Sequence, residues 1–117
     1  MPRFVILEHD HPHLHWDLML EAAGSLRTWR LAAPPSSSAS VEATPSFDHR
    51  LVYLHYEGPI SGGRGRVVQW DSGCFEGQVG GDGGVEVRLD GRRLRGVLRI
   101  AAGQGGVWAA AYLPADG

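Results

Sequence analysis

Residues 13–20 read HLHWDLML, a stretch in which every second residue is apolar. Side chains two positions apart project from the same face of a β-strand. One face would therefore carry Leu14, Trp16, Leu18 and Leu20, and the other His13, His15, Asp17 and Met19. We predict a strand over residues 13–21 whose apolar face packs on a core, while His15 and Asp17 project together from the opposite face.

Strand-like segments separated by turn residues continue on both sides of this stretch. β-branched and aromatic residues favour strands over residues 3–8 and 26–31, whereas the periodicity of residues 49–56 does not decide between a strand and irregular structure. The chain contains 17 glycines, many of them in its second half, which is typical of short strands joined by tight turns. There we predict one hairpin from residues 64–71 and 74–79, a second from residues 85–89 and 94–100, and a last strand over residues 107–113.

These segments predict an all-β fold: a single antiparallel β-barrel of about eight short strands with little helix, since a barrel leaves no free strand edges. A length of 117 residues fits one domain over residues 1–117. Within it, we expect residues 32–46 (AAPPSSSASVEATPS) to form an exposed loop rich in proline and serine, and residues 114–117 to form a tail.

The bulk composition is that of an ordinary folded protein. The formal net charge of −2 gives no electrostatic argument for binding a polyanion, although all 11 basic residues are arginine. The single cysteine, Cys74, excludes an intrachain disulfide and fits a reducing compartment. No apolar segment is long enough for a signal peptide or a membrane span. We expect a cytoplasmic protein with no membrane partner.

Residues 8–17 (EHDHPHLHWD) hold four of the six histidines. Imidazole and carboxylate groups at this density must stay solvated, find hydrogen-bond partners or bind a metal ion. Pro12 interrupts the run, so the histidines before it should belong to a different strand or to a turn. A divalent cation could be held by His15, Asp17 and a histidine returning from the neighbouring strand, because two histidines and one carboxylate leave coordination positions open.

Five blocks of the chain, in order, resemble the 3′-phosphoesterase domain of bacterial DNA ligase D. FVILEHDHPHLHWDLMLE is similar to the opening of that family, in which a His-Asp pair is followed by His-aromatic-Asp and then by Leu-Glu. The blocks SLRTWRLAAPPS, DHRLVYLHYEG, GRVVQWDSGCFE and LDGRRLRGVLRI match later segments of the family pattern. The similarity runs from Phe4 to Ile100, and its order along the chain is stronger evidence than any one block.

The resemblance implies a site and an activity. His9, His15 and Asp17 would ligate a divalent cation, most simply Mn²⁺, and His49 would contact the scissile phosphate or act as an acid with support from Tyr53. The family removes 3′-phosphates and 3′-terminal ribonucleosides from a primer strand during DNA end repair. The expected partners are therefore 3′ ends of DNA primer–templates, together with a ligase, a polymerase or an end-binding repair protein. His11 and His13 have no counterpart in the family pattern, and we expect them to be solvated.

The chain departs from the family pattern where the substrate should be gripped. Met19 stands where the family has an arginine, so a bidentate phosphate contact is missing, and Leu7 and Ala33 replace a polar residue and a lysine. The candidates to supply the missing cations are Arg30, Arg50, Arg64 and Arg66. Three functions stay open: a metal-dependent phosphoesterase acting on 3′ ends with an altered phosphate-binding shell, a non-catalytic module that binds DNA ends or repair partners, and a hydrolase for a small phosphoester.

Overall fold

The computed structural model describes residues 1–80 and 84–115. Its strands are β1 (Arg3–His9), β2 (His15–Ala22), β3 (Ser25–Leu31), β4 (Val41–His49), β5 (Gly58–Pro59), β6 (Arg66–Val79), β7 (Val85–Gly91), β8 (Arg95–Ala102) and β9 (Trp108–Pro114). Two 3₁₀ helices, η1 (Leu51–Leu54) and η2 (Gln104–Gly106), complete the regular structure of these residues, which contain no α-helix. In this part of the chain, no helix has the length and apolar character needed to cross a membrane.

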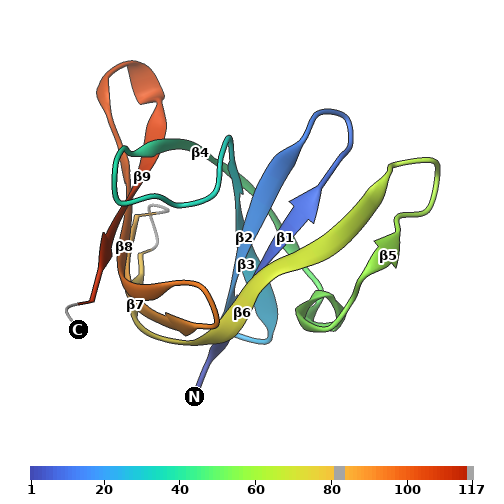
Figure 1. Ribbon diagram of the computed structural model, residues 1–117, viewed down its shortest axis with the longest axis horizontal. Helices are drawn as coiled ribbons and strands as arrows, with labels where there is room; N and C mark the ends of the chain where they lie inside the picture. The colour runs from blue at the N-terminus through green and yellow to red at the C-terminus, as the bar shows by residue number, and fades with distance from the viewer. Residues whose placement is uncertain (81–83, 116–117) are drawn as a thin grey trace.

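Eight of the strands close into an antiparallel barrel (Figure 1). Their hydrogen-bonded order is β1-β2-β3-β4-β9-β8-β7-β6, and β6 pairs back with β1. The short strand β5 lies outside this ring and pairs with the start of β6. The predicted all-β antiparallel barrel is therefore confirmed, and closure leaves the strands of the ring with partners on both edges.

β1 and β2 are buried on both faces. Their inward side chains, such as Ile6 and Leu18, join the core of the barrel. Side chains of the opposite parity contribute to a second apolar cluster on the outer face, made of Val5, Leu7, Met19, Leu26, Leu54 and Val67. Tyr53, Tyr56 and Ile60 pack against this outer cluster. The segment from η1 to the residue after β5 thus covers one side of the barrel and leaves the adjoining ends of β1 and β2 for polar groups.

The loop expected over residues 32–46 is wrong in its second half, because β4 begins at Val41. β4 pairs with β3 from Ala43 onward and with β9 at Val41 and Glu42. Ala43 is the one fully buried residue of this strand, so its sequence lacks the apolar alternation that identifies a strand. The expected tail over residues 114–117 also starts too early, since Pro114 ends β9; residues 116–117 lie outside the described part of the chain.

The hairpin expected around residues 71–73 is wrong as well, because β6 runs unbroken from Arg66 to Val79. Gly73 serves a close approach of strands rather than a turn: a Cβ there would collide with the backbone carbonyl of Asp90. The buried carboxylate of Asp71 accepts hydrogen bonds from the backbone N–H groups of Ser72, Arg92, Arg93 and Leu94. Asp71 therefore ties β6 to the β7–β8 turn, and the hairpin expected there is confirmed.

Candidate metal centre and its cavity

Two neighbouring strand ends bring together two histidines and one aspartate. His9 ends β1, and its antiparallel partner across the ladder is His15, the first residue of β2. Directly paired residues share a face of the sheet, and Asp17 follows His15 by two positions on that face. Asp17 Oδ2 lies 3.6 Å from His9 Nδ1 and 3.3 Å from His15 Nε2. One ligand atom from each residue falls within 4.8 Å of the other two.

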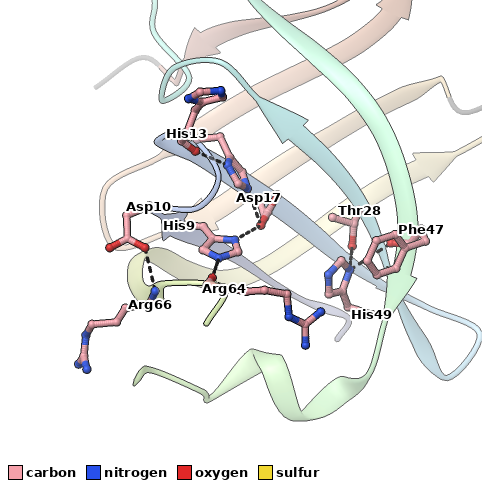
Figure 2. A network of polar contacts seen from close by, with 10 residues as sticks. His9, Asp10, His13, Asp17, Thr28, Phe47, His49, Arg64 and Arg66 are labelled. Atoms are coloured by element: carbon pink, nitrogen blue, oxygen red, sulfur yellow. Dashed lines mark hydrogen bonds and ion pairs between the residues drawn. The ribbon is translucent and has the colours of Figure 1, made fainter. Parts of the chain in front are cut away.

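Backbone carbonyls fix which ring nitrogen of each histidine carries a proton (Figure 2). His9 Nε2 donates to Arg64 O at 2.8 Å, and His15 Nδ1 donates to His13 O at 2.8 Å. A carbonyl oxygen only accepts, so in the neutral rings the proton sits on these nitrogens. His9 Nδ1 and His15 Nε2 then turn lone pairs toward the Asp17 carboxylate. Three electron-rich atoms facing one another fit a bound cation, and the carbonyl contacts are those that orient histidine ligands at metal sites.

The loop before β6 is itself anchored beside His9. Asp10 Oδ1 accepts the N–H of Arg66 at 2.8 Å, and Figure 2 marks this contact with a dashed line. Between Arg64 and Arg66, Gly65 has a φ of +76°, and a Cβ there would collide with Asp10 Oδ1. Asp10 and Gly65 therefore hold the loop in the one position that directs the Arg64 carbonyl to His9.

A cavity of about 390 Å³ opens beside these ligands. His9 and Asp17 line it, together with three of the arginines expected to bind substrate: Arg30, Arg50 and Arg64. Arg30 is the direct ladder partner of Asp17 on β3, whereas Arg64 Nε donates to Ser61 O at 2.7 Å. Arg66, the fourth expected arginine, is not among the lining residues. The described lining of the cavity comes entirely from residues 7–67.

His49 lines the same cavity because a β-bulge in β4 redirects its side chain. Thr28 pairs with Ser46 and Leu26 pairs with His49, so β4 has one more residue than β3 between these two pairs. His49 Nδ1 lies 3.1 Å from Phe47 O and 2.9 Å from Thr28 Oγ1. Because Thr28 Oγ1 donates to Leu26 O, both partners of Nδ1 are acceptors and Nδ1 carries the ring proton.

Burial lowers the pKa of His49 below its ordinary value of 6.5, and His9 adds a smaller lowering effect. Asp17, the Phe47 carbonyl and Asp48 act in the opposite direction without reversing the shift. The imidazole of His49 is therefore neutral near pH 7. Tyr53, on η1, meets His49 edge to face with ring centroids 5.5 Å apart. The two residues expected to be catalytic thus lie in contact at the wall of the cavity, and their roles stay predictions.

Met19 lies where the family pattern has an arginine. Its side chain is 1% exposed, belongs to the outer apolar cluster and lines the cavity. Met19 therefore gives the wall of the cavity an apolar patch. The expected change in the phosphate-binding shell stays a prediction. The ladder partner of Met19 on β3 is Thr28, and Arg30, two residues further along β3, pairs with Asp17.

Several contributors to the site were not expected from the sequence. Thr28, Phe47 and the Arg64 carbonyl position the two histidines His49 and His9. Near β4, only the sequence Asp48-His49-Arg50 after Phe47 indicated a functional site. A backbone carbonyl cannot be predicted as a contact from the sequence, because every residue has one. His13 gives the site its carbonyl rather than its side chain, and His11, expected to be solvated, is exposed at the cavity wall.

Comparison with known proteins shows the family of the chain. The sequence model of the family described as the DNA ligase D 3′-phosphoesterase domain matches residues 7–101. The multifunctional non-homologous end joining DNA repair protein LigD of Mycobacterium tuberculosis (strain H37Rv) is 34% identical over 116 residues, covering 92% of this chain and 15% of that protein.

Two further relatives carry closely similar names. The multifunctional non-homologous end joining protein LigD of Pseudomonas aeruginosa is 33% identical over 106 residues, covering 80% of this chain and 12% of that protein. Its counterpart in Mycolicibacterium smegmatis is 37% identical over 79 residues, covering 63% of this chain and 10% of the relative. The chain thus spans 15% or less of the length of these proteins. The resemblance seen in the sequence is confirmed: the chain belongs to the family of DNA ligase D 3′-phosphoesterase domains.

Proposed function

We propose that the protein is a metal-dependent phosphoesterase that removes a 3′-phosphate or a 3′-terminal ribonucleoside from a nucleic-acid strand. The observation that carries the proposal is the convergence of His9, His15 and Asp17, with one ligand atom from each within 4.8 Å of the other two, beside a cavity lined by three arginines. Two histidines and one carboxylate suit a divalent cation with open positions, and arginines suit phosphate.

The cation proposed for these ligands is Mn²⁺, which accepts imidazole and carboxylate ligands together and would supply Lewis-acid stabilisation of charge on the phosphoryl group. The protein residues orient the substrate. Arg30 and Arg50 line the cavity and are proposed to bind phosphate oxygens. His49 is proposed to contact the scissile phosphate through Nε2 or to act as the acid. Its Nδ1 is already committed to Phe47 O and Thr28, so either role requires Nε2 to take up a proton, which the negative charge of a bound phosphate favours.

The test is end trimming by the purified protein with Mn²⁺. The substrates are a DNA primer–template whose primer ends in a 3′-phosphate and a second whose primer ends in one ribonucleotide. We expect release of phosphate from the first and shortening of the second. Asp17→Asn should abolish both reactions, while His13→Ala, a neighbour that gives the site only its backbone carbonyl, should keep them. Wild-type activity no higher than that of Asp17→Asn would overturn the proposal.

Met19 favours a second candidate, a non-catalytic module that binds DNA ends or repair partners. An apolar side chain lies in the cavity where the family has an arginine, which weakens the grip on phosphate. In that case binding of a 3′-phosphorylated end at low salt, where phosphate contacts are strongest, would survive His49→Ala and no product would form. The third candidate, a hydrolase for small phosphoesters, is favoured by the 390 Å³ cavity, and a mononucleotide substrate tests it.

The proposal extends to the process in which the protein acts. The relatives are named as non-homologous end joining proteins, and on that basis we propose a role in DNA end repair beside a ligase, a polymerase or an end-binding protein. A cytoplasmic location stays a prediction that rests on the sequence. Co-purification of the tagged protein with such partners, from cells exposed to agents that break DNA, tests the setting separately from the chemistry.

A further inference from the structure

Phe47 is an exposed aromatic side chain at the wall of the cavity. It is 73% exposed, it lines the cavity, and neither hydrophobic cluster of the described residues includes it. Its ring stacks on the imidazole of His49 with centroids 4.6 Å apart and planes 18° apart, and both side chains are drawn in Figure 2. An aromatic side chain of this size adds little to the fold when it is this exposed, so its position calls for another explanation.

The backbone holds the two rings together. The bulge in β4 lies between Ser46 and His49, and bulges near active sites redirect side chains. As a result Phe47, Asp48 and His49 all line the cavity, instead of alternating between two faces. The Phe47 carbonyl and Thr28 both bind His49 Nδ1. Because His49 covers one face of the Phe47 ring, the opposite face remains for a planar partner.

We propose that Phe47, backed by His49, forms a stacking subsite for the nucleobase of the terminal nucleoside whose 3′-phosphate enters the cavity. This inference rests on the proposed function and names the part of the substrate that the protein recognises. The subsite is continuous with the cavity that His9, Asp17 and three arginines line, so one nucleotide places its phosphate among cationic groups and its base on the exposed ring. Every base has a π-face, so the subsite selects for the presence of a base rather than for its identity.

Binding of a fluorescent end tests the subsite without turnover. The probe is a hexanucleotide that ends in 2-aminopurine with a 3′-phosphate, titrated at low salt in the presence of a chelator. We expect wild-type protein to quench the fluorescence, and Phe47→Ala to weaken binding at least about 5-fold, as for loss of one stacked base. Phe47→Trp should bind within about 2-fold of wild type, since tryptophan keeps a stacking face.

A matched control separates the subsite from a general effect of removing an exposed apolar group. Leu113 on β9 is 71% exposed, against 73% for Phe47, and does not line the cavity; Leu113→Ala should bind as wild type does. A hexanucleotide whose terminal residue is abasic but carries the 3′-phosphate should bind wild type and Phe47→Ala equally. Equal binding of the 2-aminopurine probe to wild type and Phe47→Ala, or equal wild-type binding of base and abasic ends, would overturn the inference.

Two further measurements assign the outcome. Release of phosphate from the abasic end with Mn²⁺ shows that the proposed phosphoesterase stands even if the subsite fails. If no substrate end releases phosphate, the proposed function is wrong, while the dependence of binding on the base and on Phe47 can still be measured. Adenosine 3′-monophosphate shows whether the base belongs to a free nucleotide or to a strand end. If the protein binds it as tightly as the hexanucleotide, the subsite recognises a free nucleotide. If the protein binds it more weakly, the subsite recognises a strand end.

Discussion

His9 Nε2 donates a hydrogen bond to the backbone carbonyl of Arg64 at 2.8 Å, across 55 positions of the chain. The loop that precedes β6 therefore sets the orientation of a proposed metal ligand on β1. Since the same carbonyl fixes the proton on Nε2, it also decides that Nδ1 faces Asp17. Metal affinity should then depend on residues that touch no metal.

Gly65→Ala should lower the affinity for Mn²⁺ about 10-fold or more, the usual effect of losing a contact that orients a ligand. A Cβ at this position would collide with Asp10 Oδ1, so the Arg64 carbonyl must leave His9. Isothermal titration of metal into the protein measures the effect. The matched control is Gly63→Ala, because Gly63 also has a positive φ, +68°, but nothing lies within 4 Å of its Cβ position. Equal affinities of the two variants would contradict the prediction.

Adding Mn²⁺ should raise the melting temperature, and a chelator should reverse the rise. A ligand present at about 100 times its dissociation constant stabilises the folded protein by about 2.7 kcal/mol if it binds only that state. Asp17→Asn, which removes the charged ligand, should abolish the metal-dependent rise. Differential scanning calorimetry with and without metal measures it, and a rise of the same size in Asp17→Asn would show that the ion binds elsewhere.

The stability of the metal-free protein should fall as the pH drops below about 6.5, in part because of His49. Its folded pKa lies below 6.5, so in that range the unfolded chain binds more protons at this residue than the folded protein does. The contribution of His49 to the stability of the folded protein is fully present at a pH above the pKa of the unfolded chain. It is lost as the pH falls through the pKa of the folded protein. His49→Gln should therefore lose less melting temperature than wild type between pH 7.5 and 5.5. An equal loss in both would rule out His49 as a source.

Met19→Arg should strengthen the binding of inorganic phosphate about 10-fold or more, as expected for a new charge-assisted contact in a partly enclosed site. Met19 lines the cavity at 1% exposure, so the longer side chain can extend into it. It should also lower the melting temperature, because Met19 belongs to the outer apolar cluster. Met19→Gln is the control that adds a polar group without a charge. An equal gain in phosphate affinity in Met19→Gln and Met19→Arg would show that the gain does not come from the guanidinium.

Asp71→Asn should destabilise the protein by about 3 kcal/mol or more, since it replaces one oxygen of a buried carboxylate that accepts four backbone N–H groups. Chemical denaturation measures the change. Asp90→Asn is the control, because Asp90 is exposed and its ion pair with Arg95 spans 3.9 Å at the surface. A change below about 1 kcal/mol in Asp71→Asn would mean that Asp71 is not the tie between β6 and the following turn.

The strands predicted correctly are those whose sequences are rich in apolar and β-branched residues or alternate between apolar and polar residues, such as β1 and β2. β7 has a strictly alternating burial pattern, and its hairpin with β8 follows from the sequence. β4 buries only Ala43, so little periodicity remains to be seen. Asp71 and Gly73 resemble turn residues but serve capping and close approach inside a continuous strand. These roles exist only once three strands have come together.

The candidate site divides in the same way. Parity along residues 13–20 predicted that His15 and Asp17 share a face, and the family pattern added His9. What the sequence could not supply is the set of contacts that orient these residues. The carbonyls of Arg64 and His13 carry no sequence signal, and the bulge that turns His49 and Phe47 to one side appears only when β3 and β4 are paired.

The described lining of the cavity comes from residues 7–67, whereas β7, β8 and β9 complete the ring through residues 85–114. The described residues that line the cavity therefore all precede β7, and the last three strands of the ring contribute none of them. Engineering for thermal tolerance can be confined to the second half, with consensus or core-filling substitutions there. The contacts offered to a substrate can be redesigned among the cavity residues, while stabilising substitutions in the second half offset losses such as the one expected at Met19.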